Sequence, residues 1–393
     1  MSRSRWLPVG AALFLFGSLT TGSASAATLA SHDEEASARG WTQFQLSAAK
    51  TGWNRDEERL TRHNVASLRQ RWASPPGLSG SPVVVGERVI GELGGALVAL
   101  STRDGRMLWT RPLGGDVAIP PGALASGDGL VVVTTSTGTD AVRLRSGALV
   151  WHTGDVAGSR GPTIAGDTVY VGSYDHHVYA LSLRTGRVKW STATTDEVHS
   201  TIAVSGRTAY VGADNELLAL DTATGAVRWH TAIGSVHGGG PSLRDGTVYI
   251  AADLQGEGSS GQLYAVRASS GAVVWRANLG DDVHAAPSVD GTNVYIGLID
   301  NGVFAFDART GQPRWNRTVD GEVWAAASIA GGVVYVTVDT SQVVGLDART
   351  GAIRWSASAD PRDFATQTAP AVTGGRLYVG FGSAGIHAYA PRH

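Results

Sequence analysis

Short runs of β-branched and aromatic residues, separated by glycine-containing turns, recur along most of the chain. Runs such as "DTVYVGS", "TNVYIGL" and "GVVYVTV" have the length and composition of β-strands. Each is followed by a second apolar run, for example "LLALDTA" or "GVFAFDA", and then by a tight turn marked by a "TG" dipeptide. No segment shows a convincing 3.6-residue period, so the pattern predicts an all-β protein of short antiparallel strands.

A nine-residue phrase shows how these strands are grouped. "DARTGQPRW" ends at Trp315, and "DARTGAIRW" ends 40 residues later at Trp355. The pattern Gly, three residues, Trp occurs seven times, with a small residue six positions before each glycine. These small residues are Ala99, Ala141, Ala180, Ala219, Ala265, Ala305 and Gly345. The spacing between tryptophans runs from 37 residues (Trp72 to Trp109) to 46 (Trp229 to Trp275), the range of propeller blades.

Each unit therefore predicts one blade of four strands, A to D, with strand A innermost. The eight tryptophans that begin the units are Trp72, Trp109, Trp151, Trp190, Trp229, Trp275, Trp315 and Trp355. We expect them to be structural: a large ring on strand D fills the wedge between blades, and the small residue on strand C makes room for it. The last unit has strands A to C ("TAPAV", "RLYVGF", "GIHAYA") and no D, whereas "LRQRW" (68–72) resembles a D strand with no A to C before it. The sequence thus predicts an eight-bladed β-propeller of four-stranded antiparallel blades, whose last blade is closed by an N-terminal strand.

The repeated small residue, glycine and tryptophan resemble the tryptophan-docking motif of pyrroloquinoline quinone (PQQ)-like β-propellers, over roughly residues 41–393. That superfamily includes quinoprotein dehydrogenases and outer-membrane assembly propellers of the BamB type. For an enzyme, the resemblance implies a vicinal cysteine pair, a tryptophan, a calcium site, a catalytic aspartate and long inserted loops. The chain has no cysteine and units of 37 to 46 residues, so PQQ is not expected and no cofactor is predicted. The BamB type implies a binding role, although its usual lipid-anchoring cysteine is missing here.

The N-terminus predicts export. Two arginines precede an apolar run of 14 residues (6–19), and "SASA" offers a cleavage site after Ala26. We assign residues 1–26 to a signal peptide, 27–40 to a flexible leader, 41–67 to an N-terminal strap and 68–393 to the propeller. The strap is expected to be irregular, with a turn of helix around 61–68, and to carry the chain to the last blade.

The composition excludes several classes of binding partner and chemistry. The formal net charge is −2, which provides no field for nucleic acid, and no later stretch is long and apolar enough to span a bilayer. Without cysteine there are no disulfides, cysteine–zinc sites or thiol catalysis. We expect a secreted monomer that is not a lipoprotein.

The candidate binding site lies where strand A begins. Aligned units place the following residues at the channel mouth: His199, His237, His284, Trp324 and Gln367, accompanied by Glu197, Asp282 and Glu322. Loops between strands D and A share one face of a propeller, the face where ligands commonly bind. A metal site is not predicted, because ligands on separate blades would have to converge on one ion. The bland alternative is that these residues simply fill a semi-exposed rim.

Other motifs are weaker. "GEGSSG" (256–261) matches G-x-G-x-x-G, but no helix follows it, so it is assigned to a long B–C loop spanning 253–261. The favoured function is an exported, non-catalytic propeller that binds a protein, glycan or small ligand at the channel face. The alternative is an enzyme, either a degenerate PQQ-dependent dehydrogenase or a lyase or hydrolase, with its site at the funnel mouth.

Overall fold

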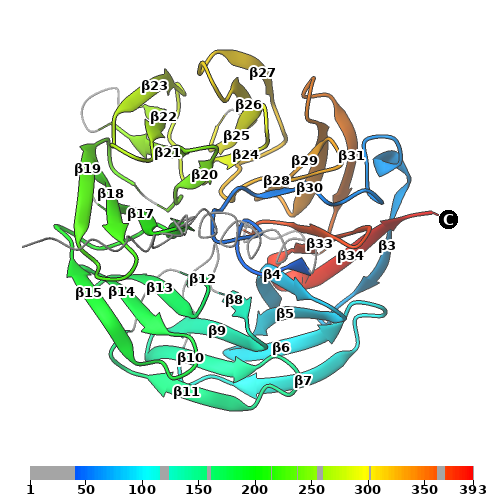
Figure 1. Cartoon of the computed structure of the whole chain (residues 1–393). Helices are drawn as coiled ribbons and strands as arrows, with labels where there is room; N and C mark the ends of the chain where they lie inside the picture. Colours follow the sequence, from blue (N-terminus) through cyan, green and yellow to red (C-terminus); the bar gives the residue numbers. More distant parts are fainter. Residues whose placement is uncertain are drawn as a thin grey trace, which may run out of the picture.

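Eight twisted sheets stand around a central axis in the computed structural model (Figure 1). The structure describes residues 40–115, 124–156, 161–213, 215–236, 238–254, 260–300, 302–360 and 368–392. Blade 1 consists of β4 (Leu78–Val85), β5 (Arg88–Leu93), β6 (Ala96–Ser101) and β7 (Met107–Pro112), and blade 2 of β8 (Leu124–Gly127), β9 (Leu130–Thr135), β10 (Gly138–Arg143) and β11 (Leu149–Thr153). Blade 3 consists of β12 (Thr163–Ala165), β13 (Thr168–Ser173), β14 (His177–Ser182) and β15 (Val188–Ala193), and blade 4 of β16 (Ala203–Ser205), β17 (Thr208–Ala213), β18 (Glu216–Asp221) and β19 (Val227–Ala232).

Blades 5 to 7 repeat this order, and blade 8 contains strands from both ends of the chain. Blade 5 consists of β20 (Ser242–Arg244), β21 (Thr247–Asp253), β22 (Gly261–Arg267) and β23 (Val273–Asn278), and blade 6 of β24 (Ser288–Val289), β25 (Asn293–Leu298), β26 (Gly302–Asp307) and β27 (Pro313–Arg317). Blade 7 consists of β28 (Ser328–Ala330), β29 (Val333–Val338), β30 (Gln342–Asp347) and β31 (Ile353–Ser358), and blade 8 of β32 (Ala371–Thr373), β33 (Arg376–Gly380), β34 (Ile386–Pro391) and β3 (Leu68–Ala73). Two 3-10 turns, η1 (Val65–Ser67) and η2 (Gly382–Ala384), complete the described elements together with β1 (Gly40–Trp41) and β2 (Trp53–Asn54). No helix in the described part of the chain is long and apolar enough to cross a membrane.

The ring closes as the spare strands predict. β3 pairs antiparallel with β34, with Leu68 opposite Pro391 and Trp72 opposite Ala388. The N-terminal strand thus supplies strand D of blade 8, and the outer edge of β34 is paired instead of exposed. The all-β, eight-bladed architecture predicted from the repeat is confirmed.

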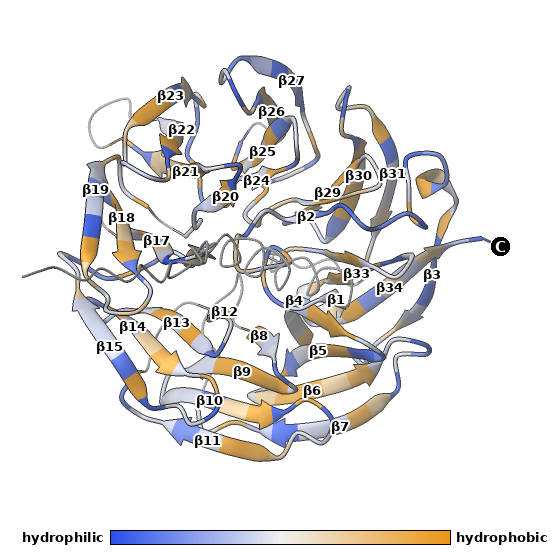
Figure 2. Cartoon of the chain, in the orientation of Figure 1, coloured by the Kyte–Doolittle hydropathy of each residue, from blue (hydrophilic) through white to orange (hydrophobic). Residues whose placement is uncertain are grey.

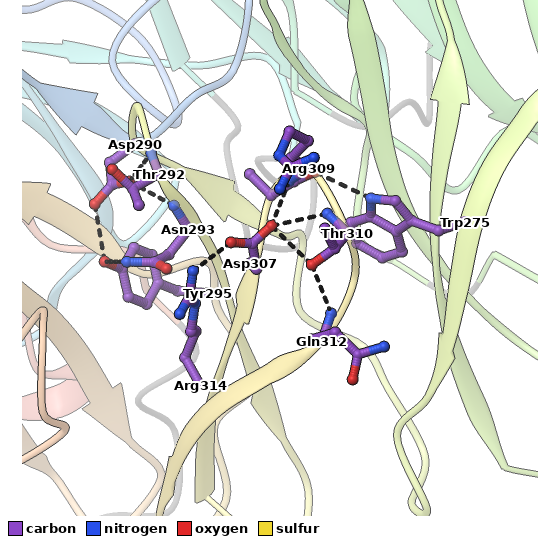
Figure 3. Close-up of polar contacts among 11 residues, drawn as sticks. Trp275, Asp290, Thr292, Asn293, Tyr295, Asp307, Arg309, Thr310, Gln312 and Arg314 are labelled. Carbon is purple, nitrogen blue, oxygen red and sulfur yellow. Dashed lines mark hydrogen bonds and ion pairs between the residues drawn. The ribbon is translucent and has the colours of Figure 1, made fainter.

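The tryptophan motif joins neighbouring blades. Within a blade, the small residue pairs in register with the tryptophan, as Ala265 does with Trp275. The indole then reaches the next blade, where Trp275 Nε1 donates to the Ala308 carbonyl at 3.0 Å (Figure 3). Equivalent bonds of 2.8–3.0 Å are formed by Trp72, Trp109, Trp151, Trp190, Trp229 and Trp315. Trp355, the eighth, lies edge-on against Tyr389 of blade 8.

The glycine of each motif is required by the tryptophan of the preceding blade. At Gly311 φ is +72°, and a Cβ there would lie 2.6 Å from Cε3 of the Trp275 ring. Glycine therefore satisfies both the left-handed turn and the close contact. The two ends of the sequence "GQPRW" therefore lie at different blade interfaces. Gly311 packs against the tryptophan of the preceding blade, and Trp315 donates a hydrogen bond to the following blade.

An aspartate sets the shape of this turn. Asp307 Oδ1 accepts hydrogen bonds from the Thr310 hydroxyl (2.9 Å) and from the amides of Thr310 (2.8 Å) and Arg309 (3.0 Å), while its other oxygen pairs with Arg314 (Figure 3). Led by the Thr310 hydroxyl, these donors lower the pKa of Asp307 to about 2. The recurring "DARTG" sequence thus forms the turn between strands C and D.

Packing is distributed between blades. One apolar cluster combines Tyr170 and Val178 of blade 3 with Val204 and Val211 of blade 4, and other clusters likewise join adjacent blades. Apolar residues follow the strands around the whole ring (Figure 2). Burial between sheets therefore rests on each blade having a neighbour on both sides.

The strap does more than lead to the last blade. Residues 40–57 run along the inner strands of all eight blades in order, and in Figure 1 their blue trace crosses the middle of the ring. β1 pairs with β4 of blade 1, and β2 pairs in parallel with β28 of blade 7. Bonds to the other blades join Thr42 to Ser126, the Gln43 side chain to Ile164, Ala48 to Val204, Ala49 to Leu243, Thr51 to Val289, and the Asn54 side chain to Val372. The strap is therefore a structural part of the channel wall.

Candidate functional site at the channel mouth

The propeller has two different faces. Because successive strands are antiparallel, the A–B and C–D turns lie on one face, and the B–C turns and D–A loops lie on the other. We call the first the turn face and the second the mouth face. The strap bonds to the ends of strands A next to the A–B turns, so it closes the channel toward the turn face.

A buried valine anchors the loops that carry His199, His284 and Trp324. Val198, Val283 and Val323 are 0%, 4% and 0% exposed. Val198 and Val323 lie on glycines of the preceding blade, where an added Cβ would come within 2.4 Å at Gly172 and 2.1 Å at Gly297. The residue after each valine therefore has a fixed starting point at the mouth.

The first group at the mouth is centred on His199. Its Nε2 lies 3.1 Å from Glu197 Oε2, and its ring centroid lies 5.1 Å from that of Tyr174. The His199 and Glu197 side chains are 40% and 43% exposed, so solvent screens this pair and it contributes little to stability. The group is accessible and presents an aromatic ring, an imidazole and a carboxylate together.

The second group joins two neighbouring loops. The rings of His284 and Trp324 are 4.8 Å apart, and Trp324 Nε1 donates to Glu322 Oε2 at 2.7 Å. The Glu322 amide in turn donates to Asp339 Oδ1 at 3.0 Å, which fixes this loop to a B–C turn. Both rings are half-buried, and the arrangement offers an apolar surface bordered by a carboxylate.

The remaining predicted residues are placed less fully. Asp282 is exposed beside these groups, whereas His237 and Gln367 lie outside the described residues. The long B–C loop is described only at its ends, where Asp253 pairs with Gly261 and Asp253 Oδ1 accepts from the Val283 amide at 3.1 Å. Among the described residues no three acidic or histidine side chains are grouped closely enough to hold a metal.

The channel behind the mouth is filled by the strap. Phe44 is 2% exposed and forms a cluster with Ala286, Ala325, Ala326 and Ala369 at the inner ends of blades 6 to 8. Lys50 has no exposed surface, and its Nζ donates to the Phe44 carbonyl at 3.3 Å. Sequence reasoning did not find this plug, because nothing in residues 40–54 has the periodicity of a strand that belongs to a sheet.

A family model described as "Outer membrane protein assembly factor BamB" matches the chain at residues 26–139, 119–256, 215–317 and 259–393. The chain belongs to this family. The resemblance drawn from the tryptophan motif is thereby confirmed. No curated protein matches the chain.

Solved structures share the fold at low sequence identity. BamB from Moraxella catarrhalis is 20% identical with a TM-score of 0.67, covering 83% of this chain and 98% of its own. Quinohemoprotein alcohol dehydrogenase ADHIIG from Pseudomonas putida HK5 is 13% identical with a TM-score of 0.72, covering 94% and 82%. The quinohemoprotein alcohol dehydrogenase from Comamonas testosteroni is 16% identical with a TM-score of 0.68, covering 93% and 86%. BamB and alcohol dehydrogenases share this fold, so function must be argued from the site.

Proposed function

We propose that the protein is an exported, non-catalytic scaffold that binds a partner protein at its channel mouth. The observation that carries this proposal is the pair of half-exposed groups described above, Tyr174–His199–Glu197 and His284–Trp324–Glu322, on loops anchored by buried valines. Aromatic side chains on a fixed frame contribute large contact area at low entropic cost. The family also favours a protein partner, since its description is that of an assembly factor.

Two features argue against the enzyme alternative. The chain has no cysteine for the vicinal pair that the quinoprotein resemblance implies. In addition, Phe44 occupies the space inside the inner ends of blades 6 to 8, beneath the mouth. A glycan or small ligand would use the same rings and carboxylates, and is distinguished from a protein by the experiment below.

Site-specific photo-crosslinking tests the proposal. A photoreactive phenylalanine analogue replaces Trp324 at the mouth, and in a matched control it replaces Arg184, which is 76% exposed at its side chain on the turn face. We expect a discrete protein adduct from the mouth position alone. The triple change His199→Ala, His237→Ala and His284→Ala should keep the melting temperature and reduce the adduct.

Equal adducts from both faces, or an adduct indifferent to the triple change, would refute the mouth as the binding site. A glycan or small ligand would yield no protein adduct and would instead be retained by the purified protein. Reconstitution with PQQ and calcium followed by dye-linked alcohol oxidation tests the enzyme alternative, and turnover there would overturn the non-catalytic assignment.

A further inference from the structure

A cavity of about 910 Å³ opens on the turn face, where blade 8 meets blade 1. We call it the seam cleft. Its walls are the A–B and C–D turns of blade 1 (86–88 and 101–106), the A–B turn of blade 8 (373–376) and strap residues 54–59. It forms at the ring closure because the strap leaves the channel here on its way to β3, and it lies on the face opposite the predicted mouth.

The walls of the seam cleft are held in place by polar contacts between its segments. Glu57, 6% exposed, accepts from the amides of Arg59 (2.8 Å), Leu60 (3.1 Å) and Gly375 (2.9 Å), which fixes the strap to blade 8. Arg376 donates to the carbonyls of Thr102 and Arg103, which fixes blade 8 to blade 1. The cleft is therefore preformed by three segments that are distant in sequence.

Three further arginines, Arg59, Arg88 and Arg103, line this cavity. Within the described part of the chain, their guanidinium groups have no ion pair or hydrogen bond. Arg88 Nε is buried and has no acceptor, a state that costs free energy unless another oxygen reaches it. Because they lie on the strap and on two turns of blade 1 around the same cavity, one ligand in this cavity could contact all three.

Most acidic side chains of the cleft already form ion pairs or hydrogen bonds within the protein. Asp104 pairs with Arg106 at 3.7 Å, Asp56 pairs with Arg55 at 3.5 Å, and Glu57 is occupied by three amides. Glu58 and Glu87 remain, both exposed to solvent, where their charges are screened. In the described part of the chain, three arginines and two glutamates of the lining are thus left without an ion pair. Arg59 and Arg103 are exposed like the two glutamates, whereas Arg88 is partly buried and carries the desolvated nitrogen.

Tyr378 completes the lining. Burial raises the pKa of its phenol to about 12, so the group keeps its proton at neutral pH and can donate a hydrogen bond. Guanidinium groups recognise carboxylate and phosphate oxygens through paired, charge-assisted hydrogen bonds. The volume lies in the range of small-molecule sites, which is about 300–1,000 Å³.

From these observations we infer that the seam cleft is a second binding site, one that takes a multivalent anion bearing carboxylate or phosphate groups. Arg88 contacts the anion at the wall of the cleft, and Arg59 and Arg103 contact it from the strap and from the C–D turn of blade 1. The ligand thereby bridges the strap and the first blade. This site is independent of the mouth.

Calorimetric titration of the full mature chain at low salt tests the inference with two probes. Citrate supplies carboxylates and inorganic pyrophosphate supplies phosphates. We expect at least one of them to bind with one-to-one stoichiometry, and the double variant Arg88→Gln, Arg103→Gln to weaken binding by about tenfold or more, since each lost charged hydrogen bond contributes more than 1 kcal/mol. Arg145→Gln is the matched control, because Arg145 holds the same turn position in blade 2 and lies outside the cleft.

The preferred probe identifies the anion class, and a preference for either supports the site. Failure of both probes to bind the wild-type chain overturns the inference, as does binding that survives in a double variant with an unchanged melting temperature. Equal loss in Arg145→Gln would mean that the anion follows general surface charge, which also overturns it. The triple histidine variant should bind the probe normally, so failure of the mouth proposal and failure of this one give different results.

Discussion

Replacing Lys50 by methionine should stabilise the protein at mildly acid pH and lose that advantage as pH rises. Lys50 is fully buried inside the ring, and its Nζ donates a hydrogen bond to the Phe44 carbonyl at 3.3 Å. Burial lowers the pKa of the amine from 10.5 to about 7. Methionine matches the length of the side chain and carries no charge.

The magnitude follows from proton linkage. Lowering the pKa of Lys50 from 10.5 to about 7 corresponds to roughly 5 kcal/mol against the charged form in the fold. Below pH 7 both states bind the proton and the wild-type chain carries the full penalty. Between about 7 and 10.5 the unfolded chain binds more protons than the folded one, so wild-type stability rises with pH in that window.

For Lys50→Met, which does not titrate, we expect a gain of about 3–4 kcal/mol at pH 6, after subtracting about 1 kcal/mol for the lost hydrogen bond. The gain should shrink by about 1.4 kcal/mol per pH unit above 7 and disappear before pH 10.5.

Denaturant unfolding of both chains from pH 6 to pH 10 measures this difference. Lys189→Met serves as the control, since the chain has only these two lysines and Lys189 pairs with Asp167 at the surface. NMR of chains labelled at lysine follows the two amines directly. A Lys50→Met effect that is constant with pH, or a Lys50 signal that titrates near 10.5, would refute the reasoning.

Three other outcomes are expected. Trp229→Ala should lower the free energy of unfolding by about 2–4 kcal/mol, slightly less than for a fully buried ring because the residue keeps some exposed surface; calorimetry that shows no loss would show that Trp229 does not stabilise the blade contact. Gly172→Ala should displace Val198, since its Cβ would lie 2.4 Å from that side chain, and should weaken the crosslink at the mouth more than it lowers the melting temperature; an unchanged crosslink would contradict the anchoring role. Deletion of residues 41–72 removes β3 and the strap from the inner strands, and should cause aggregation or a large fall in melting temperature; melting like that of the full mature chain would show that ring closure is not structural.

The repeat could be read from the sequence because each blade contact is encoded locally. Ala305, Gly311 and Trp315 lie within eleven positions, and strand pairing and turn geometry place them without reference to distant residues. The same letters recur in each unit, so one contact predicts them all, and the unpaired pieces at the two ends predict the closure by β3. What the motif alone did not show is that its glycine and its tryptophan serve opposite neighbours.

Only part of the arrangement at the channel mouth could be predicted from the sequence. The Val-His pattern marks the loops before strand A, and His199 and His284 lie on such loops in the structure. The pairing of His284 with Trp324 and of His199 with Tyr174 depends on how adjacent loops cross the blades. His237 and Gln367 remain predictions outside the described residues. The roles of all these residues in binding also remain a proposal.

The path of the strap and the seam cleft were decided by tertiary structure alone. Asn54 bonds to Val372, 318 positions away, and the cleft joins Arg59, Arg88 and Arg376 from three parts of the chain. No periodic pattern marks such contacts, because an irregular segment meets a different blade at almost every step. Lys50 shows the limit most clearly. In the sequence it is an ordinary polar residue of the irregular strap, and only the closed ring around it removes it from water and lowers its pKa. The sequence by itself determined the blade and the number of blades, since those rest on local register and turns; the ring decided what lies inside it, since burial there depends on all eight blades at once.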